Sequence, residues 1–351
     1  MIGEKFSTAQ VESFRSLIAD YTLEKSLPKE AALVSLIDEV ITCLENEPAL
    51  YRPRSQEKKV GGLLDFTQLE QKPVILVPDI HARFDFLPAL LSSHILKSSS
   101  LDVTVLEALF MDAVRIVCVG DVWHTENASW GYERWRNAYE DWMNGKVAGP
   151  DMLEEMKENF KAVRTVMALK KAFPTAFHFL KGNHENILNT EGGGDHGFLK
   201  FAMEGEMVRD FIKEVYGDVC LHLLSCFEKA LPIVALFPTF GVSHAEPKSA
   251  YKREGIINYH SYPDLILSFT WTANDEARKG SVVRQLQELV PSLPAKDALW
   301  FAGHRPVPEK YLLRQEGSLV QFHNPDEMNV VLIDPKRKFN VETDIKPILK
   351  N

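Results

Sequence analysis

One arrangement recurs through the middle of this chain and limits the folds open to it: a short apolar run is followed at once by polar residues able to bind a metal or move a proton. The runs are Val74–Val77, Arg115–Val119, Ala176–Leu180, Thr239–Ser243 and Ala298–Ala302. Runs of this length are typical of buried β-strands. Between Gly149-Pro150 and Pro174 the apolar residues recur at helical spacing instead, so strands alternate with helices. The pattern predicts an α/β layered fold with ligand-binding groups at the strand ends.

Each run ends in a motif whose side chains can ligate metals. In chain order the motifs are Asp79-Ile80-His81, Gly120-Asp121, Gly182-Asn183-His184-Glu185, Ser243-His244 and Gly303-His304. A single aspartate after a strand is usually a turn or helix cap, and a single buried histidine is usually just hydrogen-bonded. Five such motifs in one order are much harder to explain in that way, because strand ends converge on one edge of a sheet.

The ligand types also indicate which metals to expect. Carboxylate, imidazole and amide oxygen together suit Mn²⁺, Fe or Zn²⁺, and a carboxylate can bridge two ions. The sequence therefore predicts a site for two divalent metal ions, with Mn²⁺ as the leading candidate and Fe or Zn²⁺ as alternatives.

In these motifs and their order, the chain resembles the calcineurin-like metallophosphoesterase superfamily, whose pattern is D-x-H, then G-D, then G-N-H-E/D, then two separated histidines. The resemblance covers roughly residues 73–335. It implies a four-layer α-β-β-α sandwich with two mixed sheets. Position by position, it implies that one metal is bound by Asp79 and His81, that both metals are bridged by Asp121, and that the second site is completed by Asn183, His244 and His304.

The same resemblance implies a reaction. In this family a metal-bound hydroxide attacks phosphorus in line, the two cations neutralise the developing charge, and a histidine assists the leaving oxygen. His184 is the candidate for that last role. The implied activity is hydrolysis of a phosphomonoester or of a nucleotide pyrophosphate bond. The expected partner is a phosphorylated small molecule, a nucleotide or a phosphoprotein.

The second motif departs from the Ser/Thr protein phosphatase branch of the family. That branch reads G-D-x-x-D-R-G, whereas here His124 stands in place of the second aspartate and Thr125 in place of the arginine. His124 becomes a second catalytic candidate that could pair with His184, or Glu126 could orient one of the two histidines. The plainer alternative for His124 is a loop histidine that faces solvent.

The missing arginine leaves the phosphate without its usual partner. Arg83 and Arg305 lie beside metal ligands in the sequence, and a guanidinium can bind two phosphate oxygens at once. Both are therefore predicted to bind substrate, with a surface salt bridge as the alternative for each.

Two other functions remain open. The G-D-x-x-H arrangement around His124 resembles the second motif of Mre11-type DNA nucleases, so a phosphodiesterase or nuclease is one alternative. Against it, the segment Gly303–Val307 resembles the GHTPV of bacterial protein phosphatases and diadenosine tetraphosphate hydrolases, and the formal net charge of -9 makes nucleic acid an unlikely partner. The second alternative is an interaction module that keeps the metals without catalysis. The remaining histidines are expected to be hydrogen-bonded only: His94, His178, His196, His222, His260 and His323.

The rest of the chain divides around this region. Residues 1–72 are predicted to form an N-terminal helical extension that covers the sheet or mediates dimerisation, residues 73–335 the phosphoesterase domain, and residues 336–351 a C-terminal tail. Residues 1–7 lack the apolar run of a secretory signal, and no apolar stretch has the roughly 20 residues of a membrane span. We therefore expect a soluble, cytoplasmic protein with no membrane partner, in an oligomeric state that the sequence leaves open.

Two segments near the motifs have unusual composition. Residues 191–197, EGGGDHG, lack the residues of a phosphate-binding P-loop and are predicted to be a mobile loop. Residues 123–173 are predicted to form an aromatic-rich helical insertion. Packing of one helical face on the core is the main interpretation of its aromatic residues, and a lid beside the metals is the alternative. The aromatic residues of that face are Tyr132, Trp135, Tyr139 and Trp142.

Overall fold

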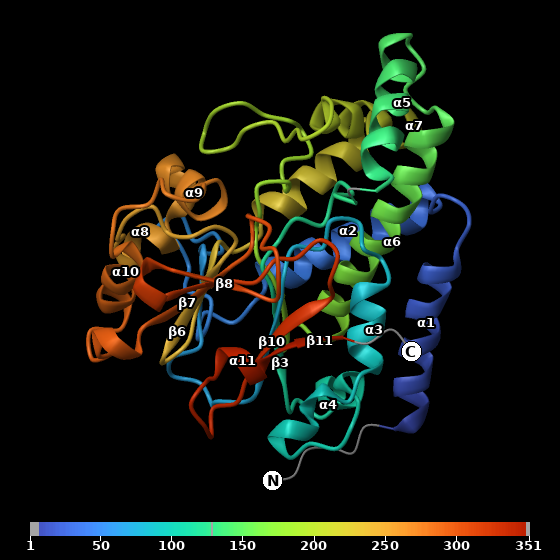
Figure 1. Ribbon diagram of the computed structural model, residues 1–351. Helices are drawn as coiled ribbons and strands as arrows, with labels where there is room; N and C mark the ends of the chain where they lie inside the picture. Colours follow the sequence, from blue (N-terminus) through green and yellow to red (C-terminus); the bar gives the residue numbers. More distant parts are fainter. Residues whose placement is uncertain (1–6, 128, 349–351) are drawn as a thin grey trace.

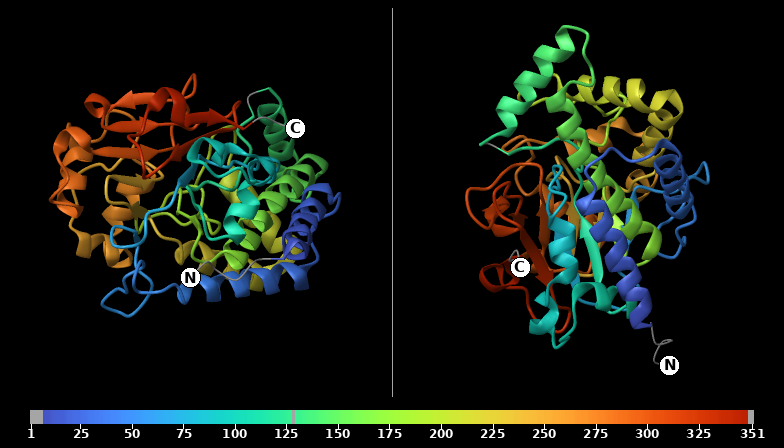
Figure 2. Two further views of the ribbon diagram at one scale, coloured as in Figure 1. Left: turned by 90° about the horizontal axis from the view of Figure 1, so that it is seen from below. Right: turned by 90° about the vertical axis from the view of Figure 1, so that its right-hand side faces the viewer.

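Two β-sheets lie face to face between two layers of helices in the computed structural model, which describes residues 7–127 and 129–348 (Figure 1). One outer layer holds α8 (Arg253–Ile257), α9 (Pro263–Thr270) and α10 (Ser281–Leu289). The opposite layer holds α1 (Thr8–Leu23), α2 (Glu30–Glu45), α6 (Pro150–Ala172) and α7 (Glu204–Lys229). The two views of Figure 2 show the same layers from below and from the side. This is the four-layer α-β-β-α sandwich that the motifs implied.

The first sheet has six strands in the order β1-β5-β6-β7-β9-β8. Its central strands β6, β7 and β9 are parallel, whereas β5 and β8 pair antiparallel to β6 and β9. The sheet is therefore mixed. Its strands are β1 (Leu63–Asp65), β5 (Val234–Leu236), β6 (Phe240–Ser243), β7 (Leu299–Ala302), β8 (Leu312–Arg314) and β9 (Leu319–Gln321).

The second sheet has five strands in the order β11-β10-β2-β3-β4. Strands β2, β3 and β4 are parallel, and β10 runs antiparallel to β2. The apolar runs of the sequence supply β2, β3 and β4 here and β6 and β7 in the first sheet, so the predicted strands are confirmed. The strands are β2 (Val74–Val77), β3 (Arg115–Cys118), β4 (Phe177–Phe179), β10 (Asn329–Ile333) and β11 (Ile345–Pro347).

Three buried apolar clusters separate the four layers. The cluster between the sheets takes side chains from both of them, such as Leu76 and Val117 from one sheet and Phe301 and Val320 from the other. A second cluster fills the space between the five-stranded sheet and helices α1, α2, α6 and α7. The third lies between the six-stranded sheet and helices α8, α9 and α10. Both faces of each sheet are thus covered, which explains why the strands read as continuous apolar runs.

Glycine and proline mark the ends or the interior of the two longest helices, α6 and α7. Helix α6 begins with Pro150 in its first turn, where a missing N–H costs nothing, and ends before Pro174. Helix α7 is interrupted at Gly217, whose φ is 77°. The shorter helices are α3 (Phe86–Ser92), α4 (Val105–Phe110), α5 (Gly131–Met143) and α11 (Val341–Asp344), and the 3₁₀ turns are η1 (Ile95–Ser99), η2 (Tyr259–Ser261), η3 (Ala295–Asp297) and η4 (Gln315–Gly317).

The N-terminal region is helical as expected and is built into the rest of the molecule. Helix α2 packs against α6 and α7. The carboxylate of Glu47, which follows α2, is buried and accepts hydrogen bonds from Arg52 and Lys170. Strand β1 pairs with β5 inside the six-stranded sheet. Among the described helices, none is long and apolar enough to cross a membrane.

Candidate metal centre

The motif residues follow strands β2, β3, β4, β6 and β7, and they meet where those strands end. The backbone turns sharply at this edge of the sheets, because several ligand candidates adopt left-handed conformations. His81 has a φ of 43°, Asp121 of 52° and His304 of 61°. Non-glycine residues adopt such values rarely, and they cluster at functional sites where the surrounding structure enforces them.

One group of side chains gathers around His81. Its Nε2 atom lies 3.6 Å from Asp121 Oδ2 and 3.9 Å from Asp79 Oδ2. The other ring nitrogen, Nδ1, donates to the backbone carbonyl of His124 at 3.0 Å, which leaves Nε2 as the atom that faces the carboxylates. His323 joins the group with its Nε2 atom 3.8 Å from Asp79 Oδ2. Asp79, His81 and His323 are close enough to bind one metal ion together.

A second group gathers around Asn183. Its Oδ1 atom lies 2.8 Å from His244 Nε2 and 2.9 Å from His304 Nδ1. His244 Nδ1 donates to the carbonyl of Val119 at 3.2 Å, so its Nε2 atom is the one directed at the group. His244 Nε2 is also 3.3 Å from Asp121 Oδ2.

Asp121 therefore stands between the two groups, with one oxygen within 3.6 Å of His81 and 3.3 Å of His244. Burial, together with the nearby charges of Glu185 and Asp79, raises the pKa of Asp121 well above its usual value. Burial also raises the pKa of Asp79 to about 6. The Oδ1 atom of Asp79 is buried and has no hydrogen-bond partner among the described residues. Cations between these groups would offset the cost of burying both carboxylates, so the donor set fits a dinuclear metal site.

The two catalytic candidates lie beside the metal ligands. His184 Nε2 is 3.9 Å from Asp121 Oδ2, and its Nδ1 atom is buried without a hydrogen-bond partner among the described residues. The ring of His124 has its centroid 5.2 Å from that of His184. His124 is fully buried and does not face solvent, and its Nε2 atom lies 3.3 Å from Glu204 Oε1. The structure thus brings the two histidines together, and their roles stay predictions.

The two arginine candidates differ in how they are held. The guanidinium of Arg83 donates to the backbone carbonyls of Ile80, Asn324, Glu327 and Asp79. Five N–H groups minus these four bonds leave one N–H for a substrate. Arg305 follows His304 directly and is exposed, and no partner of its guanidinium is found in residues 7–127 and 129–348. Arg305 has the donors to bind a phosphate, whereas Arg83 mainly fixes the backbone around Asp79.

Two side chains near the site were not singled out from the motifs. His323 was expected to be hydrogen-bonded only, and the structure places it with Asp79 and His81 in a group that could hold a metal ion. It follows β9 as the other candidates follow their strands, but no motif in the sequence joins it to them. Glu185, inside the third motif, accepts hydrogen bonds from the N–H groups of Asp121, Val122 and Gly182 and so fixes Asp121 in place.

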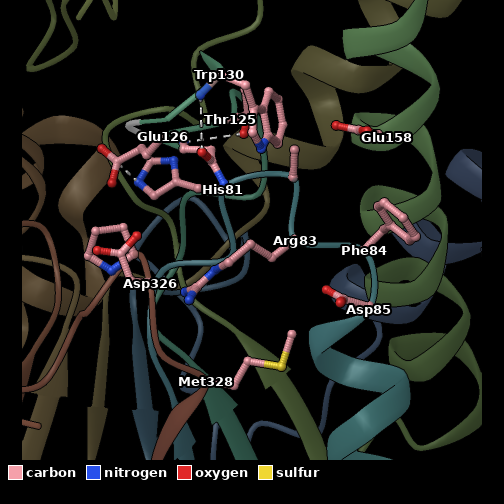
Figure 3. A pocket seen from close by; sticks show the side chains of 13 residues that line it. His81, Arg83, Phe84, Asp85, Thr125, Glu126, Trp130, Glu158, Asp326 and Met328 are labelled. Atoms are coloured by element: carbon pink, nitrogen blue, oxygen red, sulfur yellow. Dashed lines mark hydrogen bonds and ion pairs between the residues drawn. The ribbon is translucent and has the colours of Figure 1, made fainter. Parts of the chain in front are cut away.

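A cleft of about 340 Å³ opens beside His81 (Figure 3). In the figure Glu126 lies next to the His81 ring and Trp130 stands at one wall. Trp130 is 39% exposed. Most of the charged residues that line the cleft are acidic: Asp85, Glu126, Glu158 and Asp326, against Arg83.

Residues 191–203 pass over the catalytic candidates. Phe198 stacks on His184 with ring centroids 4.5 Å apart, and Lys200 Nζ lies 2.7 Å from Glu126 Oε1. Asp195 is 3.3 Å from the buried Lys181, which precedes the third motif. The segment is therefore tied to the site at three places, and the mobility expected for residues 191–197 stays a prediction.

Comparison with solved structures assigns the class of the fold. A protein serine/threonine phosphatase from Saccharomyces cerevisiae with similarity to human phosphatase PP5 matches with a TM-score of 0.61 and 13% identity, over 96% of this chain and 94% of that chain. A cold-active protein-tyrosine phosphatase of a psychrophilic Shewanella species matches with a TM-score of 0.45 and 12% identity, over 82% of each chain, a likeness too weak to bear on the fold. No protein-family model matches this chain, and no curated protein matches it in sequence. The chain has the calcineurin-like metallophosphatase fold, with buried His and Asp clusters that could hold metal ions.

Proposed function

We propose that this protein hydrolyses phosphate esters at a site for two divalent metal ions. The observation that carries the proposal is the position of Asp121, whose Oδ2 atom lies 3.6 Å from His81 Nε2 and 3.3 Å from His244 Nε2. A carboxylate shared between two sets of imidazole and amide ligands is the arrangement that a pair of hydrolytic metal ions requires.

Bound divalent ions would lower the pKa of a water molecule and neutralise charge on the phosphoryl oxygens. The protein's own groups supply the remaining functions. His184 has a buried ring nitrogen without a partner among the described residues, so it is available to give a proton to the leaving oxygen. Phe198 covers the ring of His184 and excludes water from it. Arg305 is available to bind a phosphate oxygen at the exposed side of His304.

The charge of the cleft disfavours nucleic acid as the substrate. Glu126, Glu158 and Asp326 line the cleft beside His81. A strand of nucleic acid would bring several phosphates towards these carboxylates, on a protein whose formal net charge is already -9. Trp130 offers an exposed ring on which an aromatic leaving group can pack. We therefore rank a monoester hydrolase above the nuclease alternative.

The test is release of nitrophenol from mono- and bis-nitrophenyl phosphate by metal-stripped protein to which Mn²⁺ is returned. We expect Mn²⁺-dependent cleavage of the monoester, with Asp121→Asn inactive although its circular dichroism matches that of the wild type. A preference for the diester would support the phosphodiesterase alternative instead. Binding of two Mn²⁺ without cleavage of either ester, or of a panel of nucleotides and phosphopeptides, would leave only the interaction module.

A further inference from the structure

Glu126 lies beside the first group of side chains, in contact with His81 and His323. Its side chain is only 10% exposed. The Oε1 atom is 3.4 Å from Nε2 of His81, whose ring lies next to Glu126 in Figure 3. The Oε2 atom is 3.0 Å from His323 Nε2. The Ser/Thr protein phosphatase pattern G-D-x-x-D-R-G has glycine at the corresponding place, so this carboxylate is an addition to that pattern.

The nitrogens that Glu126 contacts are those that would bind a metal. His81 uses Nδ1 to donate to the carbonyl of His124, and its Nε2 atom faces Asp79 and Asp121. The Nε2 atom of His323 is likewise the one nearest to Asp79. The carboxylate of Glu126 therefore approaches the same point in space as the other ligands do.

The spacing of these atoms fits ligands of a single ion. Ligand atoms held about 2.0–2.2 Å from one metal lie about 3.0–4.4 Å from one another, depending on the angle between their bonds. The distance from Glu126 Oε2 to His323 Nε2 is 3.0 Å. Those among the other ligands are 3.6, 3.8 and 3.9 Å. All four distances fall in this range.

We propose that Glu126 is a direct ligand of the metal ion at the first site, with Oε2 towards the ion and Oε1 held by Lys200. This inference rests on the proposed dinuclear site. Lys200 Nζ lies 2.7 Å from Oε1, so one oxygen is occupied by the lysine and the other remains for the metal. Lys200 belongs to the segment 191–203 that covers His184, so the same carboxylate links the metal site to this segment.

The additional ligand makes the two sites unequal. The second site has Asp121, Asn183, His244 and His304. A coordination number above four suits Mn²⁺ or Fe better than Zn²⁺, which is mostly four-coordinate in proteins. We infer that the first site binds Mn²⁺ more tightly than the second. The ligands of the first site are Asp79, His81, Asp121, Glu126 and His323.

The competing explanation is that Glu126 only anchors the covering segment through Lys200. The two explanations separate when each partner of the ion pair is replaced in turn. Glu126→Gln removes the charged metal ligand and the ion pair, whereas Lys200→Gln removes the ion pair and keeps the carboxylate. The second variant is therefore the matched control.

Mn²⁺ alone is titrated calorimetrically into metal-stripped wild type, Glu126→Gln and Lys200→Gln. We expect the tighter of two sites to weaken by more than about tenfold in Glu126→Gln, since even groups one step removed from a metal contribute about 10–100-fold to its affinity. Lys200→Gln should weaken that site less than Glu126→Gln does, because the ligand itself is retained and only a group one step removed from the metal is lost. Equal losses in the two variants, or wild-type binding by Glu126→Gln, would overturn the inference.

Two further measurements keep the outcomes distinct. If Asp121→Asn loses both Mn²⁺ sites while Glu126→Gln binds as the wild type does, only the role of Glu126 fails. If the wild type binds no Mn²⁺, both the proposed function and the role of Glu126 fail.

A crystal structure of the wild type with Mn²⁺ does not depend on a variant that folds. We expect Glu126 Oε2 at about 2.0–2.4 Å from the ion. A separation above about 3.5 Å would contradict ligation.

Discussion

His184 is a buried residue with one ring nitrogen free of hydrogen bonds to the described residues. Its backbone N–H donates to Asp121 Oδ1 at 2.8 Å, which fixes the residue beside the bridging carboxylate. One face of its ring is covered by Phe198, and the Nδ1 atom has no partner in the described part of the chain. A histidine held in this way is positioned by its backbone and keeps its side chain for the substrate.

Replacing His184 with Asn should lower kcat by about 10²–10⁴-fold, the usual contribution of a positioned proton donor. The loss should be larger for an alkyl phosphate than for nitrophenyl phosphate, because nitrophenolate leaves without needing a proton. Steady-state kinetics on both substrates measures the difference, and calorimetry should show two Mn²⁺ still bound. Equal losses on the two substrates would argue against the proton-donor role.

At the residue scale, the sequence predicted the side chains that lie inside motifs, since their types and order are informative. The structure brings Asp79, His81, Asp121 and Asn183 together as that order implied. His323 was not predicted, because it is separated from His304 by strands β8 and β9 and no motif joins the two. Its proximity to Asp79 arises only when β9 pairs with β7 in the sheet.

Helix α5 shows how one aromatic segment can serve two purposes. Trp135 is fully buried and stacks on His124, with ring centroids 5.0 Å apart. Trp142 donates from Nε1 to Asp210 on α7 at 3.0 Å. Packing on the core therefore explains most of the aromatic face predicted for this helix. Trp130, immediately before the helix, instead lines the cleft beside His81.

The two tryptophans should respond differently to replacement by Ala. Trp135→Ala should lower the free energy of unfolding by about 3–5 kcal/mol, because it leaves a cavity beside His124. Trp130→Ala should leave stability nearly unchanged and should raise KM for substrates with a large aromatic leaving group, while a small aryl phosphate is still hydrolysed. Urea unfolding and steady-state kinetics on both variants test this. Equal stability of the two variants would contradict the observed burial.

Among the strands, the prediction succeeded for the five that end in a recognised motif and missed the others, including β9, which His323 follows. Strands β1, β5 and β11 each have only three residues and end without a metal-binding motif, so nothing in the sequence distinguished them from loops. Strand β1 lies in the region that was predicted to be an N-terminal helical extension. Its position is set by pairing with β5, which lies far along the chain.

The N-terminal region is joined to the core through a buried charged cluster. Glu47 accepts hydrogen bonds from Arg52 and Lys170, and its Oε1 atom is 3.3 Å from His178 Nδ1. Burial opposes ionisation of Glu47, but the charges of Arg52 and Lys170 outweigh it, and the net effect lowers its pKa far below the ordinary value. The cluster links residues after α2 to α6 and β4.

Replacing Glu47 with Gln should lower the free energy of unfolding by about 3–5 kcal/mol, because two buried cations lose their partner. Since the folded-state pKa is depressed, the stabilisation is present above the unfolded value of about 4.5 and is lost as pH falls below it. Urea unfolding between pH 7 and pH 3 measures both effects. Glu45→Gln, at an exposed position on α2, should change stability by less than about 0.5 kcal/mol. A pH-independent difference between the Glu47 variant and the wild type would contradict the assignment.

For the whole molecule, the layered α/β architecture followed from the alternation of strands and helices, and the two-sheet sandwich from the resemblance of the motifs. The apolar runs predict buried strands, but a run such as Val74–Val77 carries no information on which sheet it joins. The division into six and five strands depends on pairings such as β10 with β2, between residues far apart in the sequence. Long-range pairing of this kind is decided by packing of the complete chain.

The most direct test of the account is electron paramagnetic resonance of the wild-type protein loaded with two equivalents of Mn²⁺. Two ions that share the Asp121 carboxylate lie about 3.5–4 Å apart, so we predict an exchange-coupled spectrum. In Asp121→Asn this coupling should be lost. A wild-type spectrum consisting of isolated six-line Mn²⁺ signals would show that the ions do not share a ligand, and it would contradict the dinuclear site on which the proposed function depends.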